Sequence, residues 1–132
     1  MATRIREKAA AIAKNKDNRP MAKVKYVRIS PSKIRIVLDN IRGKSAVEAL
    51  ALMENAKQAN AEVVVKLLKS AIANAENNKG LSADNLYVAE CYTTPGPIMK
   101  RISFRGRGHG ADRILKRTCH IKFILDELKE AK

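Results

Sequence analysis

The segment from Pro97 to Lys122, PIMKRISFRGRGHGADRILKRTCHIK, places the strongest constraint on how this chain can fold. It contains eight Lys and Arg residues against one acid, Asp112, which gives a local net charge of +7. It has no apolar stripe at helical spacing, and its centre is marked by Gly106, Gly108 and Gly110. A long basic arm with glycines at its middle is suited to insertion into a dense polyanion, and RNA is the first candidate.

The sequence on both sides of this arm is typical of β-strands. Residues 86–92 (LYVAECY) and 118–125 (TCHIKFIL) are rich in β-formers, and Ile121, Phe123 and Leu125 share one face of the second segment. So long a connection between strands is unusual inside a compact domain and is usually either functional or disordered. We therefore predict an antiparallel hairpin over about 86–125 that extends outward, with its tip near 105–110, where glycines permit positive φ.

Three helices are predicted before the hairpin. Ser30-Pro31 begins the first helix and Gly43 ends it, because Pro suits the first helical position and Gly suits the position after the last. Ser45 caps a second helix over about 46–55, and a third runs from about 58 to 78 and ends at Gly80. The expected core residues of the first helix are Ile34, Val37, Leu38 and Ile41. Those of the second are Val47, Leu50, Ala51 and either Met53 or Leu52. Those of the third are Ala61, Val64, either Leu67 or Leu68, Ala71 and Ala75.

The remaining segments complete a single α+β domain over residues 22–125. Residues 22–29 (AKVKYVRI) carry β-formers and predict one more strand. Residues 1–21 are expected to be a basic tail, solvated or ordered by RNA, in which Ala9, Ala10, Ile12 and Ala13 form a short helix only with a partner. Residues 126–132 are expected to be a short C-terminal tail.

The formal net charge of +14 is distributed unevenly along the chain. Residues 19–44 carry eight basic residues against one acid, whereas residues 45–90 carry four against six. Such an excess destabilises the compact state unless a partner supplies anions. For any single basic residue the alternative is an ordinary solvated helix face. We predict two RNA-binding blocks: Lys23, Lys25, Arg28, Ser30, Ser32, Lys33, Arg35, Arg42 and Lys44 in the first, and Lys100, Arg101, Arg105, Arg107, Arg113, Lys116, Arg117 and Lys122 in the second.

Other chemistry has little support in the sequence. Cys119 and His120 are adjacent, but no third residue orients them as a catalytic pair. His109, His120, Cys91 and Cys119 lack the spacing of a metal site, and GRGHG is not a nucleotide-binding loop. We therefore predict no enzyme activity, no metal and no cofactor. Two cysteines do not make a disulfide framework, so we expect free thiols, a cytoplasmic location and Cys91 and Cys119 as cross-strand neighbours.

Three stretches in a fixed order resemble one known family. They are YVRISPSKIRIVLDNIRGKS (26–45), KLLKSAIANAENN (66–78) and LYVAECYTTPGPIMKRISFRGRGHGADRILKRTCHIKF (86–123). Together they resemble the universal large-subunit ribosomal protein L-twenty-two family, in its bacterial form, over about residues 22–125. The tip departs from the usual family pattern, because Phe104 stands where Pro is common and Gly108-His109-Gly110 replaces Gly-Arg.

The resemblance implies both a fold and a role. The fold is α+β, with three helices packed on a small antiparallel sheet and a long protruding β-hairpin. The role is that of a structural constituent of the large subunit, which binds large-subunit (23S-type) ribosomal RNA and acts early in assembly. The hairpin would line the nascent polypeptide exit tunnel opposite ribosomal protein L-four and touch the nascent polypeptide. The implied tunnel residues are Met99, Lys100, Arg101, Phe104, Arg105, Gly106, Arg107, Gly108, His109 and Gly110.

Two other classes of protein were weighed against this hypothesis. A free-standing nucleic-acid-binding module would share the basic charge but would bind selected sequences away from the ribosome. A membrane-surface protein would need a basic amphipathic helix with bulky apolar residues, whereas this chain has no Trp and only two Phe. It also has no run of about 18 apolar residues, so we predict no membrane partner.

Overall fold

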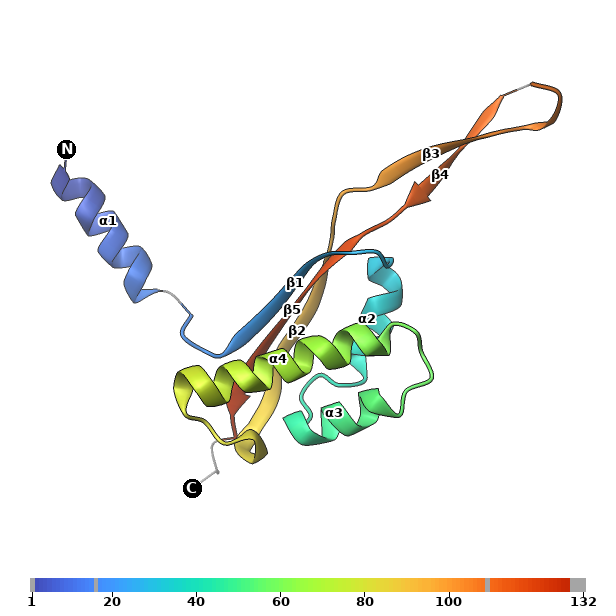
Figure 1. Cartoon of the computed structure of the whole chain (residues 1–132). Coiled ribbons are helices and arrows are strands. Elements are labelled where there is room, and N and C mark those ends of the chain that lie inside the picture. The colour runs from blue at the N-terminus through green and yellow to red at the C-terminus, as the bar shows by residue number, and fades with distance from the viewer. Residues whose placement is uncertain (1, 16, 109, 129–132) are drawn as a thin grey trace.

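The computed structural model describes residues 2–15, 17–108 and 110–128, and it has an α+β fold (Figure 1). A three-stranded antiparallel sheet has the order β1 (Met21–Val27), β5 (Cys119–Glu127), β2 (Leu86–Pro95). Three helices, α2 (Pro31–Asp39), α3 (Ala46–Glu54) and α4 (Ala61–Lys79), pack on one side of it. A two-stranded ribbon of β3 (Met99–Phe104) and β4 (Ala111–Lys116) projects away from this body. The predicted fold class is confirmed.

The core lies between the three helices and one face of the sheet. Ile34, Val37, Leu38 and Ile41 are all buried, so the apolar face predicted for the first helix is confirmed. The buried stripe of α4 is also confirmed, and Gly80 ends that helix in the left-handed conformation. Phe123 on the central strand β5 is the largest side chain that is fully buried. β5 is the central strand of the sheet, and its apolar face is buried because α4 packs on it.

The core residues predicted for α3 are partly wrong. Ala46, Ala49 and Met53 are buried, whereas Val47 is 50% exposed, Leu52 is 42% exposed and Ala51 is also exposed. Nearly every residue of AVEALALME is apolar, so periodicity alone could not choose the buried face. The structure turns the small alanines inward, and this lets α3 approach α4 and β2 closely. The predicted cap is correct, because the Ser45 hydroxyl accepts a hydrogen bond from the Glu48 amide at 3.2 Å.

A fourth helix, α1 (Ala2–Lys14), was not predicted as a stable element. It stands apart from the body in Figure 1, and its described side chains from Thr3 to Lys14 are exposed. Its alanine-rich sequence has a high helix propensity, which explains a helix without tertiary contacts. The helix therefore adds to the three that pack on the sheet and does not enlarge the core.

A polar latch holds the segment between α1 and β1 against the sheet. The Arg19 guanidinium donates to the Asp17 carboxylate at 2.7 Å and to the Glu90 carboxylate of β2 at 2.7 Å. The Pro20 carbonyl also accepts a hydrogen bond from the Leu125 amide of β5 at 3.0 Å. This latch determines where the N-terminal segment leaves the body.

The hydrogen bonds of the latch predict a lowered pKa for the Asp17 carboxyl group. The hydrogen bond from the Arg19 side chain lowers the pKa of Asp17 from its ordinary 3.8 to about 2. A depressed carboxyl pKa stabilises the folded state above the ordinary value, and this contribution is lost as the pH falls towards 2. An NMR titration of the Asp17 carboxyl carbon should have its midpoint near 2 in the wild-type protein and near 3.8 in Arg19→Gln. Equal midpoints in the two proteins would show that the latch is absent in solution.

The hairpin register corrects the prediction for the two cysteines. Cys91 pairs with Phe123 and Cys119 pairs with Pro95, so the thiols are not cross-strand neighbours. The strand pairing is centred near residue 107, and a direct pairing of Cys91 with Cys119 would need a centre at residue 105. Both cysteines are free and buried, and burial raises the pKa of each thiol.

Candidate nucleic-acid interface

The ribbon formed by β3 and β4 has an unusual cross-strand pattern. Four successive pairs each join one cation to one large apolar side chain: Met99 with Lys116, Lys100 with Leu115, Arg101 with Ile114, and Ile102 with Arg113. Residues directly opposite each other share a face, and neighbouring pairs point to opposite faces. Both faces of the ribbon therefore carry cations and apolar groups together. All twelve residues of the two strands are exposed.

This pattern indicates a partner that surrounds the ribbon. A ribbon that docked on a protein core would carry its apolar residues on one face and its polar residues on the other. RNA offers phosphates to Lys and Arg, and it offers sugars and base faces to Met, Ile and Leu. The ribbon can make both kinds of contact on either side. It is therefore suited to insertion between RNA segments.

The tip of the ribbon is a tight turn with an internal ion pair. The Arg105 guanidinium donates two hydrogen bonds to the Asp112 carboxylate, at 2.6 and 2.9 Å, and these raise the pKa of Arg105. Arg107, Gly108 and Gly110 have positive φ, in agreement with the predicted position of the turn. Phe104 is 82% exposed. His109, predicted to be a tip residue, lies outside the residues that the structure describes.

The base of the ribbon brings the two predicted basic blocks together. Arg28 and Lys33 from the first block and Arg117 from the second line a hollow of about 300 Å³, with Ser30, Asn60 and Leu115 completing the wall. The Arg28 guanidinium also donates to the Arg117 carbonyl. Three cations around one small hollow next to the beginning of α2 form a suitable phosphate site.

The remaining predicted RNA-binding residues outside the ribbon lie in three different surroundings. Lys23 and Lys122 are cross-strand partners on the sheet face opposite the helices, and Lys122 lies 5.8 Å from the centre of the Tyr92 ring. Arg42 and Lys44 instead have protein partners, since Arg42 pairs with Asp39 at 2.8 Å and Lys44 pairs with Glu48 at 2.8 Å. Lys25, Ser32 and Arg35 lie on exposed or half-exposed surface of β1 and α2.

Sequence reasoning did not single out three further aromatic and apolar residues of this interface. Tyr26, Tyr92 and Leu115 are exposed beside the cations. Alternation along β2 could have identified Tyr92, because Cys91 and Thr93 lie on the core face and Tyr92 therefore lies on the other. Alternation along β1 would instead have placed Tyr26 on the core face with Val24, since the irregularity that turns it outward has no local sequence signal.

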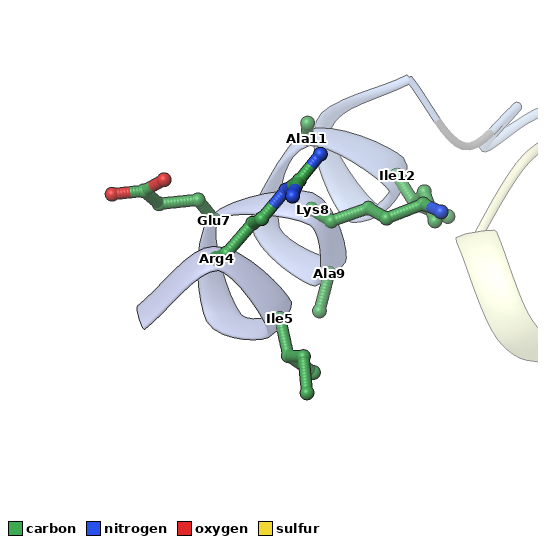
Figure 2. Close-up of a pocket in the computed structure, with 7 residues that line it drawn as sticks. All are labelled: Arg4, Ile5, Glu7, Lys8, Ala9, Ala11 and Ile12. Atoms are coloured by element: carbon green, nitrogen blue, oxygen red, sulfur yellow. The ribbon is translucent and has the colours of Figure 1, made fainter. Parts of the chain in front are cut away.

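A second hollow lies along α1, but it is not a binding site. Its lining comes entirely from one helix, including Ile5, Ala9 and Ile12. Figure 2 shows the side chains radiating from that helix, with Glu7 projecting away from Ile5, and no second element closes the space. The hollow is the open side of an exposed helix.

The described part of the chain forms neither a cluster of metal ligands nor a membrane-spanning helix. Within residues 2–15, 17–108 and 110–128, no three His, Cys, Asp or Glu residues are grouped so that they could hold a metal ion. Across those same residues, no helix is long and apolar enough to cross a membrane.

A small α+β body that carries a solvent-exposed basic ribbon is typical of the class of nucleic-acid-binding proteins. Residues 22–126 match the model of the family described as ribosomal protein L22p/L17e, and the chain belongs to that family. It is 50% identical to the large ribosomal subunit protein uL22 of Acetivibrio thermocellus, over 96% of this chain and 98% of the relative. The protein of the same name from Agathobacter rectalis is 53% identical, over 85% and 87% of the two chains.

Proposed function

We propose that this protein is a structural, non-catalytic constituent of the large ribosomal subunit that binds large-subunit (23S-type) ribosomal RNA. Family membership and the ribbon's mixed pairs on both faces support this role. The body would dock on RNA through the hollow at the base of the ribbon and the Lys23–Lys122 face of the sheet. The ribbon would thread between RNA segments and fix their relative positions, and this would aid early assembly of the subunit.

The finer part of the proposal concerns the ribbon tip. Phe104, Arg105 and the turn that follows would form part of the wall of the nascent polypeptide exit tunnel, opposite ribosomal protein L-four. The tip is the part of the ribbon farthest from the body in Figure 1, and it is compact because Arg105 is held by Asp112. The tip would contribute cations and one exposed aromatic ring, that of Phe104, to this wall.

Sucrose-gradient fractionation of cells that express the tagged chain tests this function. We expect the full-length protein to migrate with the large subunit and to remain bound through a high-salt wash. A shortened ribbon is made by replacing residues 101–114 with Asn-Gly, which keeps the Lys100–Leu115 pair as the last rung. We expect this variant still to enter subunits, because the body provides docking, but to lack the tunnel segment.

The opposite results would contradict separate parts of the proposal. Full-length protein at the top of the gradient would rule out a ribosomal role and favour a free nucleic-acid-binding module. Loss of the shortened variant from subunits would show that the ribbon, and not the body, provides docking. The matched control is Val47→Ala on the exposed side of α3, which should migrate as wild type.

A further inference from the structure

Tyr26 has the most strained backbone in the body of this protein. Its φ is +59°, a left-handed conformation that L-residues with large side chains rarely adopt. Among the described residues, the other non-glycine residue with positive φ is Arg107, in the turn at the ribbon tip. Tyr26 lies at an irregularity in β1, where Lys25 and Tyr26 together oppose the single residue His120 between the pairs Val24–Ile121 and Val27–Cys119.

His120 holds Tyr26 in this conformation. The Tyr26 amide donates a hydrogen bond to Nδ1 of His120 at 2.9 Å, so a ring nitrogen replaces the backbone carbonyl of a regular ladder. The two rings also meet edge to face, with centroids 4.8 Å apart and an interplanar angle of 86°. His120 is half-buried, and its neighbours Cys119 and Ile121 are in the core, so its own position is well determined.

The strain does not serve the core. The Tyr26 side chain is 65% exposed, although a tyrosine that contributed to folding would bury its ring. A strained residue persists when the surrounding structure enforces it, and such residues are concentrated at functional sites. The bulge and His120 together turn an aromatic ring outward at the point where the ribbon leaves the body.

The surroundings of the ring have the chemistry of a nucleotide site. Lys25 precedes Tyr26, and Arg28 follows two residues later at the wall of the basic hollow with Lys33 and Arg117. An exposed aromatic face beside several cations binds a base by stacking while the cations hold its phosphates. We infer that Tyr26 is a stacking platform for an unpaired RNA base at the root of the ribbon, and that His120 is its positioning residue. This inference rests on the proposed RNA-binding function.

Variants at Tyr26 test the contribution of its ring to RNA binding without disrupting the fold. Tyr26→Gly and Tyr26→Asn both remove the ring, and both residues tolerate a positive φ, so the fold should be retained. Binding is measured by filter retention of a transcript of the Acetivibrio thermocellus large-subunit ribosomal RNA, across a range of salt concentrations. We expect about tenfold weaker binding for both variants, as loss of one stack implies, and wild-type binding for Tyr26→Phe. The dependence of log K on log salt should not change, because no phosphate contact is removed.

The positioning role of His120 has a separate readout. Asparagine can offer an acceptor near the position of Nδ1, whereas leucine cannot. We expect His120→Leu to weaken binding about as much as Tyr26→Gly does, and His120→Asn to weaken it less. The double variant Tyr26→Gly with His120→Leu should bind no more weakly than Tyr26→Gly alone, because both changes remove the same stack.

Three results would overturn the inference. Binding of Tyr26→Gly and Tyr26→Asn within about twofold of wild type would show that the ring makes no RNA contact. A salt slope lowered by about one would indicate a phosphate contact in place of a stack. If the wild-type protein itself does not bind the transcript, the proposed RNA-binding function is contradicted as well. The first two results would contradict only the role of Tyr26.

Discussion

Replacing Lys100, Arg101, Arg113 and Lys116 together with glutamine should weaken RNA binding by about a hundredfold or more at low salt. These four cations belong to the four mixed pairs of the ribbon, so the variant removes the cation from every pair and leaves the apolar partner. If each cation neutralises one phosphate, the slope of log K against log salt should also fall by about three. Filter binding to the same large-subunit transcript, between low and physiological salt, measures both quantities.

A control with the same change in net charge shows whether position matters. Lys57, Lys66, Lys69 and Lys79 lie in the segment 45–90, whose net charge is −2, and Lys66 and Lys69 already pair with Glu62 and Glu54. Their replacement with glutamine should change RNA affinity only slightly. If both quadruple variants lose affinity equally, the position of the ribbon cations makes no special contribution to RNA binding, and net charge alone drives association.

Phe123→Ala should lower the free energy of unfolding by about 3–5 kcal/mol, the range found for large buried aromatics. Phe123 is fully buried on the central strand of the sheet, so truncation leaves a cavity between β5 and the helices. The only other phenylalanine provides the control, since Phe104 is 82% exposed at the ribbon tip. Phe104→Ala should change stability by less than about 0.5 kcal/mol. Urea unfolding followed by circular dichroism measures both, and equal stability losses would contradict the assigned core.

The helices and the hairpin could be predicted because their signals are local. The spacing of Ile34, Val37, Leu38 and Ile41 admits one buried face, and glycines near 106–110 mark one turn. The signal failed where composition was uniform, as in α3, because an almost wholly apolar helix presents no preferred face. It also failed for α1, where alanine content sufficed for a helix without a partner.

The sequence indicated which basic residues belong to the candidate interface, but it did not indicate how they come together in space. The density of Lys and Arg in 19–44 and 97–122 identified the basic blocks directly. Their meeting at the hollow between Arg28, Lys33 and Arg117 depends on contacts between segments more than 80 residues apart in sequence, as the Arg28–Arg117 hydrogen bond shows with a separation of 89. No local pattern encodes such a contact.

The sequence by itself determined the class of fold, the approximate positions of the three packed helices and of the hairpin, the family and the basic character of the ribbon, because propensity, periodicity, motif order and charge are properties of short segments. Only the tertiary structure decided the register of the hairpin, and with it the mixed cross-strand pairs and the separation of Cys91 from Cys119. It also decided the conformation of Tyr26, which depends on a histidine 94 residues away. Register and strain arise from packing across the sheet, where one residue's position depends on many distant partners at once.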